Sequence, residues 1–307
     1  MTLVNLVFPG QGSQFIGMGK DLYENNADSK LLFDQANEVL GYSISDICFE
    51  GPEDALNKTQ HTQVAIFIVS ACIYQLFAKA NLNIAAVAGH SLGEITSYYA
   101  TGVLDFESAL KIVIKRGELM GEAAQQSSGS MAAIIGLDLA TIESTINAIE
   151  GVKIANYNSP VQYVISGISD AVSTACQSLS DAGAKRVVPL PVSGAFHSEL
   201  MAPSVPKFQD YLTNFTFNSA SHPIILNRSV EPVTDASSLQ ENLPIQIQSP
   251  VRWIESIHYL SNQTSSFIEV GPGKVLSGLI KKINREFSVT PTSDYQSISE
   301  LVSKVEA

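Results

Sequence analysis

Short apolar runs alternate with longer segments of helical periodicity toward both ends of the chain. Strand-like runs cover Leu3–Phe8 and Ile84–Ala88, and each ends at a turn that contains glycine. Val64–Ala80, which is apolar almost all round, predicts a buried helix between them. Such alternation is typical of a parallel sheet with helices on both faces. Further helices are predicted over Glu94–Ala100 and Phe106–Ala124, and further strands over Pro223–Leu226 and Ser266–Val270.

In the middle of the chain the strands come closer together. The predicted order of elements is βαββαβ, which is typical of a ferredoxin-like fold. The strands are expected over Met131–Ile135, Val152–Ala155, Tyr163–Ser166 and Lys185–Leu190, with helices from Asp138 to about Ala148 and from Ser169 or Asp170 to about Ala182.

The longer alternation resumes on both sides of this part, which we therefore interpret as an insertion. We expect an α/β protein with a large parallel-sheet, α/β-hydrolase-like core and an inserted smaller ferredoxin-like βαββαβ subdomain. The core would be discontinuous, with residues 1–127 and 197–307, and the small subdomain would comprise residues 128–196.

Net charge, cysteine content and the apolar segments argue against several classes of protein: nucleic-acid-binding, metal-binding, secreted and membrane-spanning. The 307 residues carry 30 acidic and 18 basic side chains, a formal charge of −12, which disfavours binding to nucleic acid. The cysteines, Cys48, Cys72 and Cys176, are odd in number and widely spaced, so we expect reduced thiols in a cytoplasmic protein and no metal site. The first ten residues lack a basic region, and Val64–Ala80 is interrupted by polar residues, so we expect neither a signal peptide nor a membrane span.

A candidate nucleophile lies in Gly89–Gly93, which reads G-H-S-L-G. The pentapeptide directly follows a predicted strand and directly precedes a predicted helix, as a nucleophile elbow requires. Such a turn exposes the hydroxyl of Ser91 at a helix N-terminus, where negative charge is favoured. The alternative is an ordinary glycine-rich turn.

A nucleophilic serine needs a base, and the chain offers five histidines. His197 follows a predicted strand and a Ser193-Gly194 turn, a position where α/β proteins display site residues. A purely structural histidine remains the alternative, and no carboxylate is placed to complete a Ser-His-Asp triad.

Arg116 falls within the apolar stripe of the predicted helix Phe106–Ala124. A buried guanidinium needs an anion, which is either a carboxylate of the protein or one of the substrate. The stripe consists of Ala109, Ile112, Val113, Leu119 (or Met120) and Ala123.

Two glycine-rich loops imitate phosphate-binding motifs without completing them. The loop at Gly10 would need glycine in place of Phe15 to bind a dinucleotide, and the one at Gly271 would need glycine in place of Ile268 to be a Walker A loop. The first loop follows a strand, so one of its N–H groups can instead face a reacting oxygen.

In combination these motifs resemble the malonyl-CoA:acyl-carrier-protein transacylase family of bacterial fatty-acid synthesis. The resemblance extends from the first strand to about Leu279. The matching segments are FPGQGSQ from Phe8, TQ from Thr62, GHSLGE from Gly89, KRGELM from Lys115, GSMAAIIGL from Gly129, NYNSP from Asn156, GAFHS from Gly194, SPVRW from Ser249 and EVGPGKVLSGL from Glu269.

The resemblance implies transfer of a malonyl group from malonyl-CoA to acyl carrier protein, with no cofactor, by a cytoplasmic protein that is expected to be monomeric. Ser91 would be the nucleophile, His197 the base, and Arg116 the partner of the malonyl carboxylate. The remaining implied residues are the oxyanion-hole donors Gln11 and Leu92 and the substrate-binding residues Gln63, Gln246, Phe196 and His90; Gln246 would also orient His197 through its backbone carbonyl.

Two other functions remain open from the residues. One is a free-standing acyltransferase of a polyketide synthase, and the other is a serine thioesterase or esterase. The carrier protein is acidic, so its docking would need a basic patch. The candidates are Lys281, Lys282 and Arg285, or Lys185 and Arg186.

Overall fold

The larger of two sheets forms the centre of the protein. The computed structural model describes residues 3–80 and 82–306. The sheet has six strands in the order β10-β9-β1-β2-β7-β8, and all neighbours are parallel except β7 and β8. This arrangement confirms the predicted parallel core. The strands are β1 (Leu3–Phe8), β2 (Asn83–Gly89), β7 (Ile224–Ile225), β8 (Pro232–Val233), β9 (Ser266–Val270) and β10 (Ser288–Thr292).

Helices cover both faces of this sheet. Leu6 and Phe8 of β1 belong to one apolar cluster, with α5, α6 and α7, while Val7 belongs to a second cluster, with α12 and α13. Adjacent residues of a strand point to opposite faces, so one apolar strand serves two cores. The helices are α1 (Lys20–Asn25), α2 (Ala27–Leu40), α3 (Ile44–Glu50), α4 (Glu53–Leu56), α5 (Thr59–Ala78), α6 (Gly93–Ala100), α7 (Phe106–Gln126), α10 (Ser204–Leu212), α11 (Ala236–Gln246), α12 (Trp253–Ser261), α13 (Val275–Ile283) and α14 (Tyr295–Glu306), with a 3₁₀ turn at Glu199–Met201.

Helix α5 is the buried helix that the sequence predicts. By length and composition it could cross a membrane, but 72% of its apolar window is buried inside the protein, as in the core helix of a globular domain. It begins at Thr59, earlier than the apolar run alone indicates, and its polar first turns carry Gln63.

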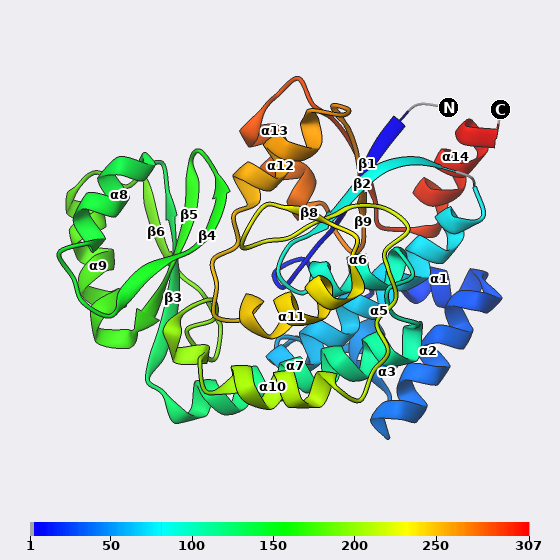
Figure 1. The fold of residues 1–307 in the computed structure, drawn as a ribbon, viewed down its shortest axis with the longest axis horizontal. Coiled ribbons are helices and arrows are strands. Elements are labelled where there is room, and N and C mark those ends of the chain that lie inside the picture. Colours follow the sequence, from blue (N-terminus) through cyan, green and yellow to red (C-terminus); the bar gives the residue numbers. More distant parts are fainter. Residues whose placement is uncertain (1–2, 81, 307) are drawn as a thin grey trace.

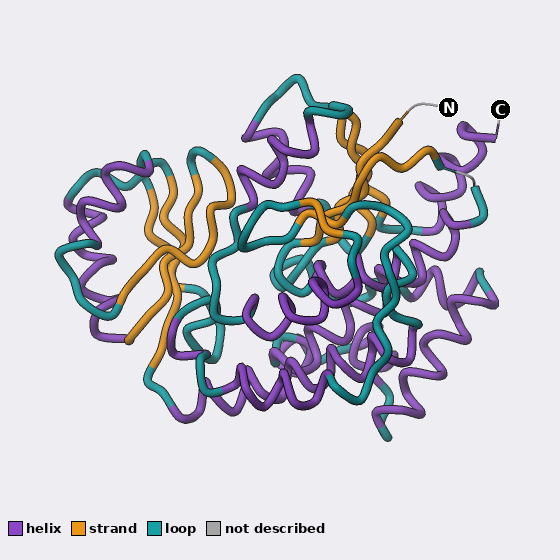
Figure 2. The backbone as a smooth tube through the Cα atoms, in the orientation of Figure 1, coloured by secondary structure: helices purple, strands orange, loops and turns teal. Residues whose placement is uncertain are grey.

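The smaller sheet has four antiparallel strands in the order β4-β5-β3-β6, which is the ferredoxin-like order. Its two helices lie on the outer face (Figures 1 and 2). Asp138 caps the first of them by accepting a hydrogen bond from the Thr141 N–H at 3.0 Å. The elements are β3 (Gly129–Ile135), α8 (Leu139–Ile146), β4 (Val152–Ser159), β5 (Gln162–Ile168), α9 (Ser169–Asp181) and β6 (Arg186–Pro189).

The inner face of the small sheet packs toward the large one. Met131, Ala133 and Val164 belong to the same apolar cluster as helices α5 and α7. The chain passes from α7 into β3 and returns after β6, so the small sheet is an insertion in the chain order. The division at residues 128 and 196 stays a prediction.

Three glycines let the elbow lie against the first strand. A Cβ at Gly93 would lie 2.1 Å from the carbonyl oxygen of Phe8, and one at Gly10 would lie 2.3 Å from that of His90. A Cβ at Gly89 would meet the backbone of Gly93 at 1.8 Å. The backbone of the turn therefore packs directly on the end of β1.

We predict that Gly93→Ala lowers the free energy of unfolding by about 3 kcal/mol, because rigid backbone would have to move. Urea unfolding followed by circular dichroism measures this loss. Gly278→Ala is the matched control, since a Cβ there has no atom within 4 Å and the position is exposed on helix α13. This control should gain about 0.5–1 kcal/mol. Equal stabilities of the two variants would contradict the close packing of the turn.

Candidate active site

Ser91 lies on the sharp turn between β2 and α6. Its φ of 53° is in the left-handed region, which a non-glycine residue adopts only when its surroundings hold it there. The Ser91 Oγ lies 2.8 Å from the Nε2 of His197 and 3.0 Å from an Nη2 of Arg116. The structure thus brings together the three residues to which the sequence analysis assigns the chemistry.

His197 is oriented by backbone carbonyls instead of a carboxylate. Its Nδ1 lies 2.9 Å from the oxygen of Ser249 and 3.2 Å from that of Gln246. A carbonyl oxygen only accepts, so Nδ1 carries the proton, and Nε2 is left to accept from the Ser91 hydroxyl. Burial lowers the pKa of His197 to about 3, and the charge of Arg116 acts in the same direction. The imidazole is therefore a neutral base at ordinary pH.

Arg116 is a buried cation whose hydrogen-bond partners are neutral. The side chain is only 1% exposed, and it donates to the amide oxygens of Gln63 at 2.6 Å and Gln246 at 3.0 Å. Within the part of the chain that the structure describes, its Nε has no partner and the guanidinium contacts no carboxylate. Burial lowers the pKa of Arg116 to about 10, against the effect of the buried Glu94 carboxylate, which forms no ion pair with it, and the guanidinium stays charged. Because no described carboxylate contacts the guanidinium, a carboxylate of the substrate is favoured over one of the protein as the partner of Arg116.

These three side chains share the wall of a cavity of about 280 Å³. Gln11 and Leu92 line the same cavity, and their amide N–H groups donate no hydrogen bond to any described residue. Two free N–H groups beside a serine oxygen can hold an oxyanion. The lining comes from both sheets and their loops: Gly10, Gln11, Gly12, Gln63, His90, Ser91, Leu92, Arg116, Met120, Met131, Ala133, Asn156, Asn158, Gln162, Val164, Leu190, Val192, Phe196, His197, Val275, Leu276 and Leu279.

Comparison with known proteins places the chain in a family. The model of the acyl transferase domain matches residues 5–305. A malonyl CoA-acyl carrier protein transacylase of Bacillus subtilis (strain 168) is 43% identical over 303 residues, which are 97% of this chain and 96% of that protein. The chain belongs to the malonyl CoA-acyl carrier protein transacylase family.

Solved structures of other transacylases have the same fold. An acyl carrier protein S-malonyltransferase from Vibrio cholerae is 40% identical, with a TM-score of 0.92 over 97% of this chain and 99% of that one. A malonyl-transacylase solved in complex with its type II PKS acyl-carrier protein is 36% identical, with a TM-score of 0.95 over 99% of this chain and 100% of that one. The predicted family and fold class are confirmed.

The remaining transacylase residues expected from the sequence surround this centre. Gln63, Phe196 and His90 line the cavity. Gln246 is not among the lining residues: its side chain accepts from Arg116 and donates to the Ser91 carbonyl at 2.8 Å. Gln246 therefore contacts Arg116 and Ser91 through its side chain and the Nδ1 of His197 through its backbone carbonyl, without lining the cavity.

The structure also shows site residues that the sequence analysis does not name. Asn158 of the small sheet lies 2.8 Å from the Nε2 of His90, which links that sheet to the elbow. Asn227 accepts from the Ser91 N–H at 2.7 Å, and the carboxylate of Glu94 accepts from the Asn227 N–H. Burial raises the pKa of Glu94 to about 7, against the effects of its hydrogen bonds and of the Arg116 charge. The acidic side chain in the first turn of α6, directly after the Gly89–Gly93 motif, is the sequence signal that could have revealed this group.

Side chains of the metal-binding types form no cluster in the part of the chain that the structure describes. Among the residues that the structure describes, no group of three or more histidine, cysteine, aspartate or glutamate side chains could hold a metal ion. The groups that can take part in a reaction in this cavity are a serine hydroxyl, a neutral imidazole, backbone amide N–H groups and one guanidinium.

We predict that the ring of His197 stays neutral between about pH 8 and about pH 5, because its pKa lies far below the ordinary 6.5. NMR titration of the histidine rings, with His197→Gln to assign the signal, measures this. In Arg116→Met the pKa should rise, since the neighbouring positive charge is gone. A ring that titrates near 6.5 in both proteins would contradict the assigned electrostatics.

Proposed function

We propose that the protein transfers the malonyl group of malonyl-CoA to the phosphopantetheine thiol of an acyl carrier protein, through a malonyl ester of Ser91. The observation that carries the proposal is the buried guanidinium of Arg116, which contacts no described carboxylate and lies 3.0 Å from the Ser91 Oγ. The names of the relatives support the same activity.

The short distance between the cation and the hydroxyl suits a malonyl group in particular. In malonyl-CoA one methylene separates the carboxylate from the thioester carbonyl. The group that binds the carboxylate must therefore lie next to the nucleophile, as Arg116 does. A neutral acetyl group would leave the buried charge without an anion, and a longer diacid would place its carbonyl farther from Ser91.

The first half-reaction is the acylation of Ser91. His197 accepts the hydroxyl proton at Nε2 while the serine oxygen attacks the thioester carbon. The amide N–H groups of Gln11 and Leu92 donate to the oxyanion, an interaction worth about 3–4 kcal/mol for one donor in comparable sites. When the tetrahedral intermediate collapses, the imidazolium protonates the departing CoA sulfur.

The second half-reaction reverses these roles. His197 accepts the proton of the carrier's thiol, whose sulfur attacks the ester carbon, and the proton then returns to the Ser91 oxygen. The carbonyls of Ser249 and Gln246 stabilise the transient imidazolium, so that no triad carboxylate is needed. CoA and the carrier are substrates, and we propose no cofactor. We further propose a cytoplasmic location, since Cys48, Cys72 and Cys176 are free thiols. A monomer is what the family resemblance implies, and we propose it on that ground.

Fatty-acid synthesis is the pathway that we propose. A carrier protein of a polyketide synthase is the second candidate, because one close structural relative was solved with such a carrier. A hydrolase is disfavoured, since water needs neither a bound carboxylate nor a docked thiol.

Transfer and hydrolysis measured in parallel test the proposal. Radiolabelled malonyl-CoA is mixed with the protein and purified carrier protein of either pathway, and the label is followed on the carrier and as free malonate. We expect most of the label on the carrier. Release mainly as malonate would overturn transfer in favour of a thioesterase, and a strong preference for the polyketide carrier would change the pathway.

We predict that Arg116→Ala lowers kcat/KM for malonyl-CoA by about 100-fold, because charged hydrogen bonds to the substrate are lost. The rate with acetyl-CoA should fall less, so the malonyl-to-acetyl ratio drops. Lys115→Ala is the matched control, since that half-buried neighbour pairs with Glu118 at 3.2 Å and lies over the ring of Tyr211, and none of these residues lines the cavity. An unchanged ratio in Arg116→Ala would remove the carboxylate-binding role.

The exposed basic end of helix α13 is our candidate for docking the carrier. Val275, Leu276 and Leu279 of this helix line the cavity, and Lys282 donates to the side chain of Gln162, another lining residue, at 3.3 Å. The alternative pair, Lys185 and Arg186, lies at the start of β6 and lines no part of the cavity. Position therefore favours Lys281, Lys282 and Arg285.

We predict that the double reversal Lys281→Glu/Lys282→Glu raises KM for the carrier by about tenfold and weakens its salt dependence. Acylation by malonyl-CoA alone should be unchanged. The reversal Lys185→Glu/Arg186→Glu makes the same change of charge and serves as control. If the control has the larger effect on carrier kinetics, the docking surface lies at β6 instead.

A further inference from the structure

Asn227 is fully buried, and every one of its polar groups is engaged at the elbow or beside it. Its side chain accepts from the Ser91 N–H at 2.7 Å and donates to the carbonyl of Gly89 at 2.6 Å. Its own N–H donates to Glu94, and its carbonyl accepts from the Arg252 N–H at 2.9 Å. One side chain thus bridges the two ends of the strained turn.

The sheet register explains how residues so distant in sequence meet. Strand β7 is parallel to β2, with Val87 opposite Ile224 and Ala88 opposite Ile225. The carboxyl ends of both strands therefore lie at the same edge of the sheet, and the residues that follow them are neighbours. Asn227 comes after β7 as Ser91 comes after β2.

Glu94 fixes Asn227 from the side of helix α6. Its carboxylate accepts from the Asn227 N–H at 2.7 Å through Oε2 and from the Nδ2 of Asn242 at 2.7 Å through Oε1. Asn242 in turn accepts from the Nε of Arg228 at 2.9 Å. The exposed fractions of Glu94 and Asn242 are 0% and 2%, so water does not replace these bonds.

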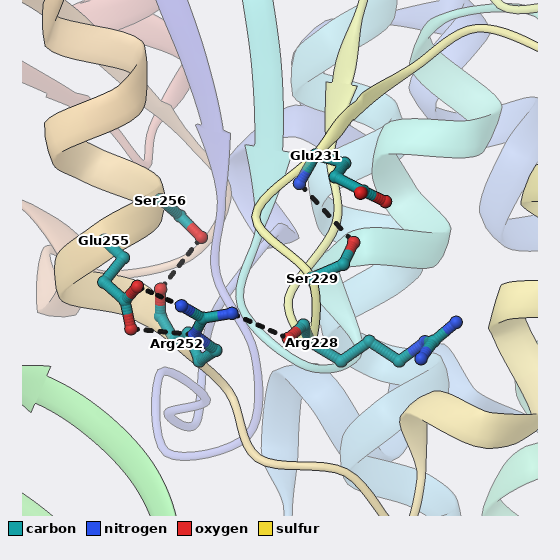
Figure 3. A network of polar contacts seen from close by, with 6 residues as sticks. All are labelled: Arg228, Ser229, Glu231, Arg252, Glu255 and Ser256. Carbon is teal, nitrogen blue, oxygen red and sulfur yellow. Dashed lines mark hydrogen bonds and ion pairs between the residues drawn. The ribbon is translucent and has the colours of Figure 1, made fainter.

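The loop that carries Asn227 is held on its outer side as well. Arg252 donates to the carbonyl of Arg228 at 3.3 Å and pairs with Glu255 on helix α12, while the side chain of Arg228 points away from Arg252 (Figure 3). The tight turn between β7 and β8 is closed by the Val230 N–H, which donates to Leu226 at 2.9 Å. Asn227 is therefore held by hydrogen bonds with helix α6 on one side and with Arg252, the residue before helix α12, on the other.

We propose that Asn227, fixed by Glu94, is a positioning residue for the acylation of Ser91. The proposal rests on the function proposed above. By accepting from the Ser91 N–H and donating to Gly89, Asn227 holds the turn at the positive φ that aims the hydroxyl at His197. It also occupies the Ser91 N–H, so that this group is not available to an oxyanion, whereas the N–H of Leu92, a lining residue of the cavity, donates to no described residue.

Single-turnover acylation separates positioning from folding. Each protein is mixed with malonyl-CoA, quenched at intervals and analysed by intact mass spectrometry. The amplitude gives the fraction of molecules that can be acylated, the rate constant reports the geometry of the site, and its dependence on malonyl-CoA gives Kd. A residue needed only for folding changes the amplitude and leaves the rate constant alone.

For Asn227→Ala we expect a rate constant about 100-fold lower at nearly full amplitude, with Kd within about threefold of the wild type. Asn5→Ala is the matched control: Asn5 is equally buried and donates to two carbonyls, those of Leu260 and Thr264, away from the cavity. It should lose stability but keep its rate constant.

A second pair of variants keeps the proposal testable if Asn227→Ala does not fold. Glu94→Gln supplies one oxygen for the Asn227 N–H but turns an NH₂ toward the Nδ2 of Asn242, and we expect about a tenfold loss of rate. The double variant Glu94→Gln/Asn242→Asp exchanges the amide and the carboxylate between the two positions. The NH₂ of the new glutamine then donates to the new aspartate, which still accepts from Arg228, so the rate should be restored.

Slowing of Asn227→Ala or Glu94→Gln at full amplitude, together with recovery in the double variant, supports the proposal. An unchanged rate constant in Glu94→Gln, a loss of amplitude alone, or no recovery in the double variant overturns it. A wild-type protein that forms no malonyl ester refutes the proposed function itself, so the two failures are distinguishable.

Discussion

A positive charge kept out of water beside a serine hydroxyl is the constraint on which the rest of the site depends. Burial of the Arg116 guanidinium is unfavourable unless an anion compensates it, and the described residues supply only amide and hydroxyl oxygens at contact distance. Burial disfavours protonation of His197 and the same charge acts in the same direction, so the base stays neutral. A substrate that brings its own carboxylate satisfies the cation and places its carbonyl at the nucleophile.

The fold provides the rigidity that such a site requires. Ser91 follows a central strand of the large sheet, Arg116 and Gln63 project from two packed helices, and Gln246 ends a third. The small sheet supplies the far wall through residues such as Asn158 and Val164. Each reacting group is thereby fixed by elements distant in sequence, and the carboxyl edge of the parallel sheet is where they converge.

Much of this arrangement is predictable because it is encoded locally. The β2–Ser91–α6 turn is a contiguous motif, and the stripe on α7 predicts that Arg116 is buried. Strand β10 is not predicted, since Ser288–Thr292 is mostly polar, contains a proline and pairs only with β9. The roles of Asn227 and Ser249 are not predicted, for another reason. Asn227 reaches the elbow because of the register of β7 beside β2, and Ser249 acts through its backbone carbonyl, and neither feature can be recognised from residue types.

Peptide mapping after incubation with malonyl-CoA, without carrier protein, tests directly whether Ser91 is the nucleophile. We expect one malonyl ester, located on Ser91 and absent from Ser91→Ala. A malonyl group on any other residue, or an ester that persists in Ser91→Ala, would contradict this assignment.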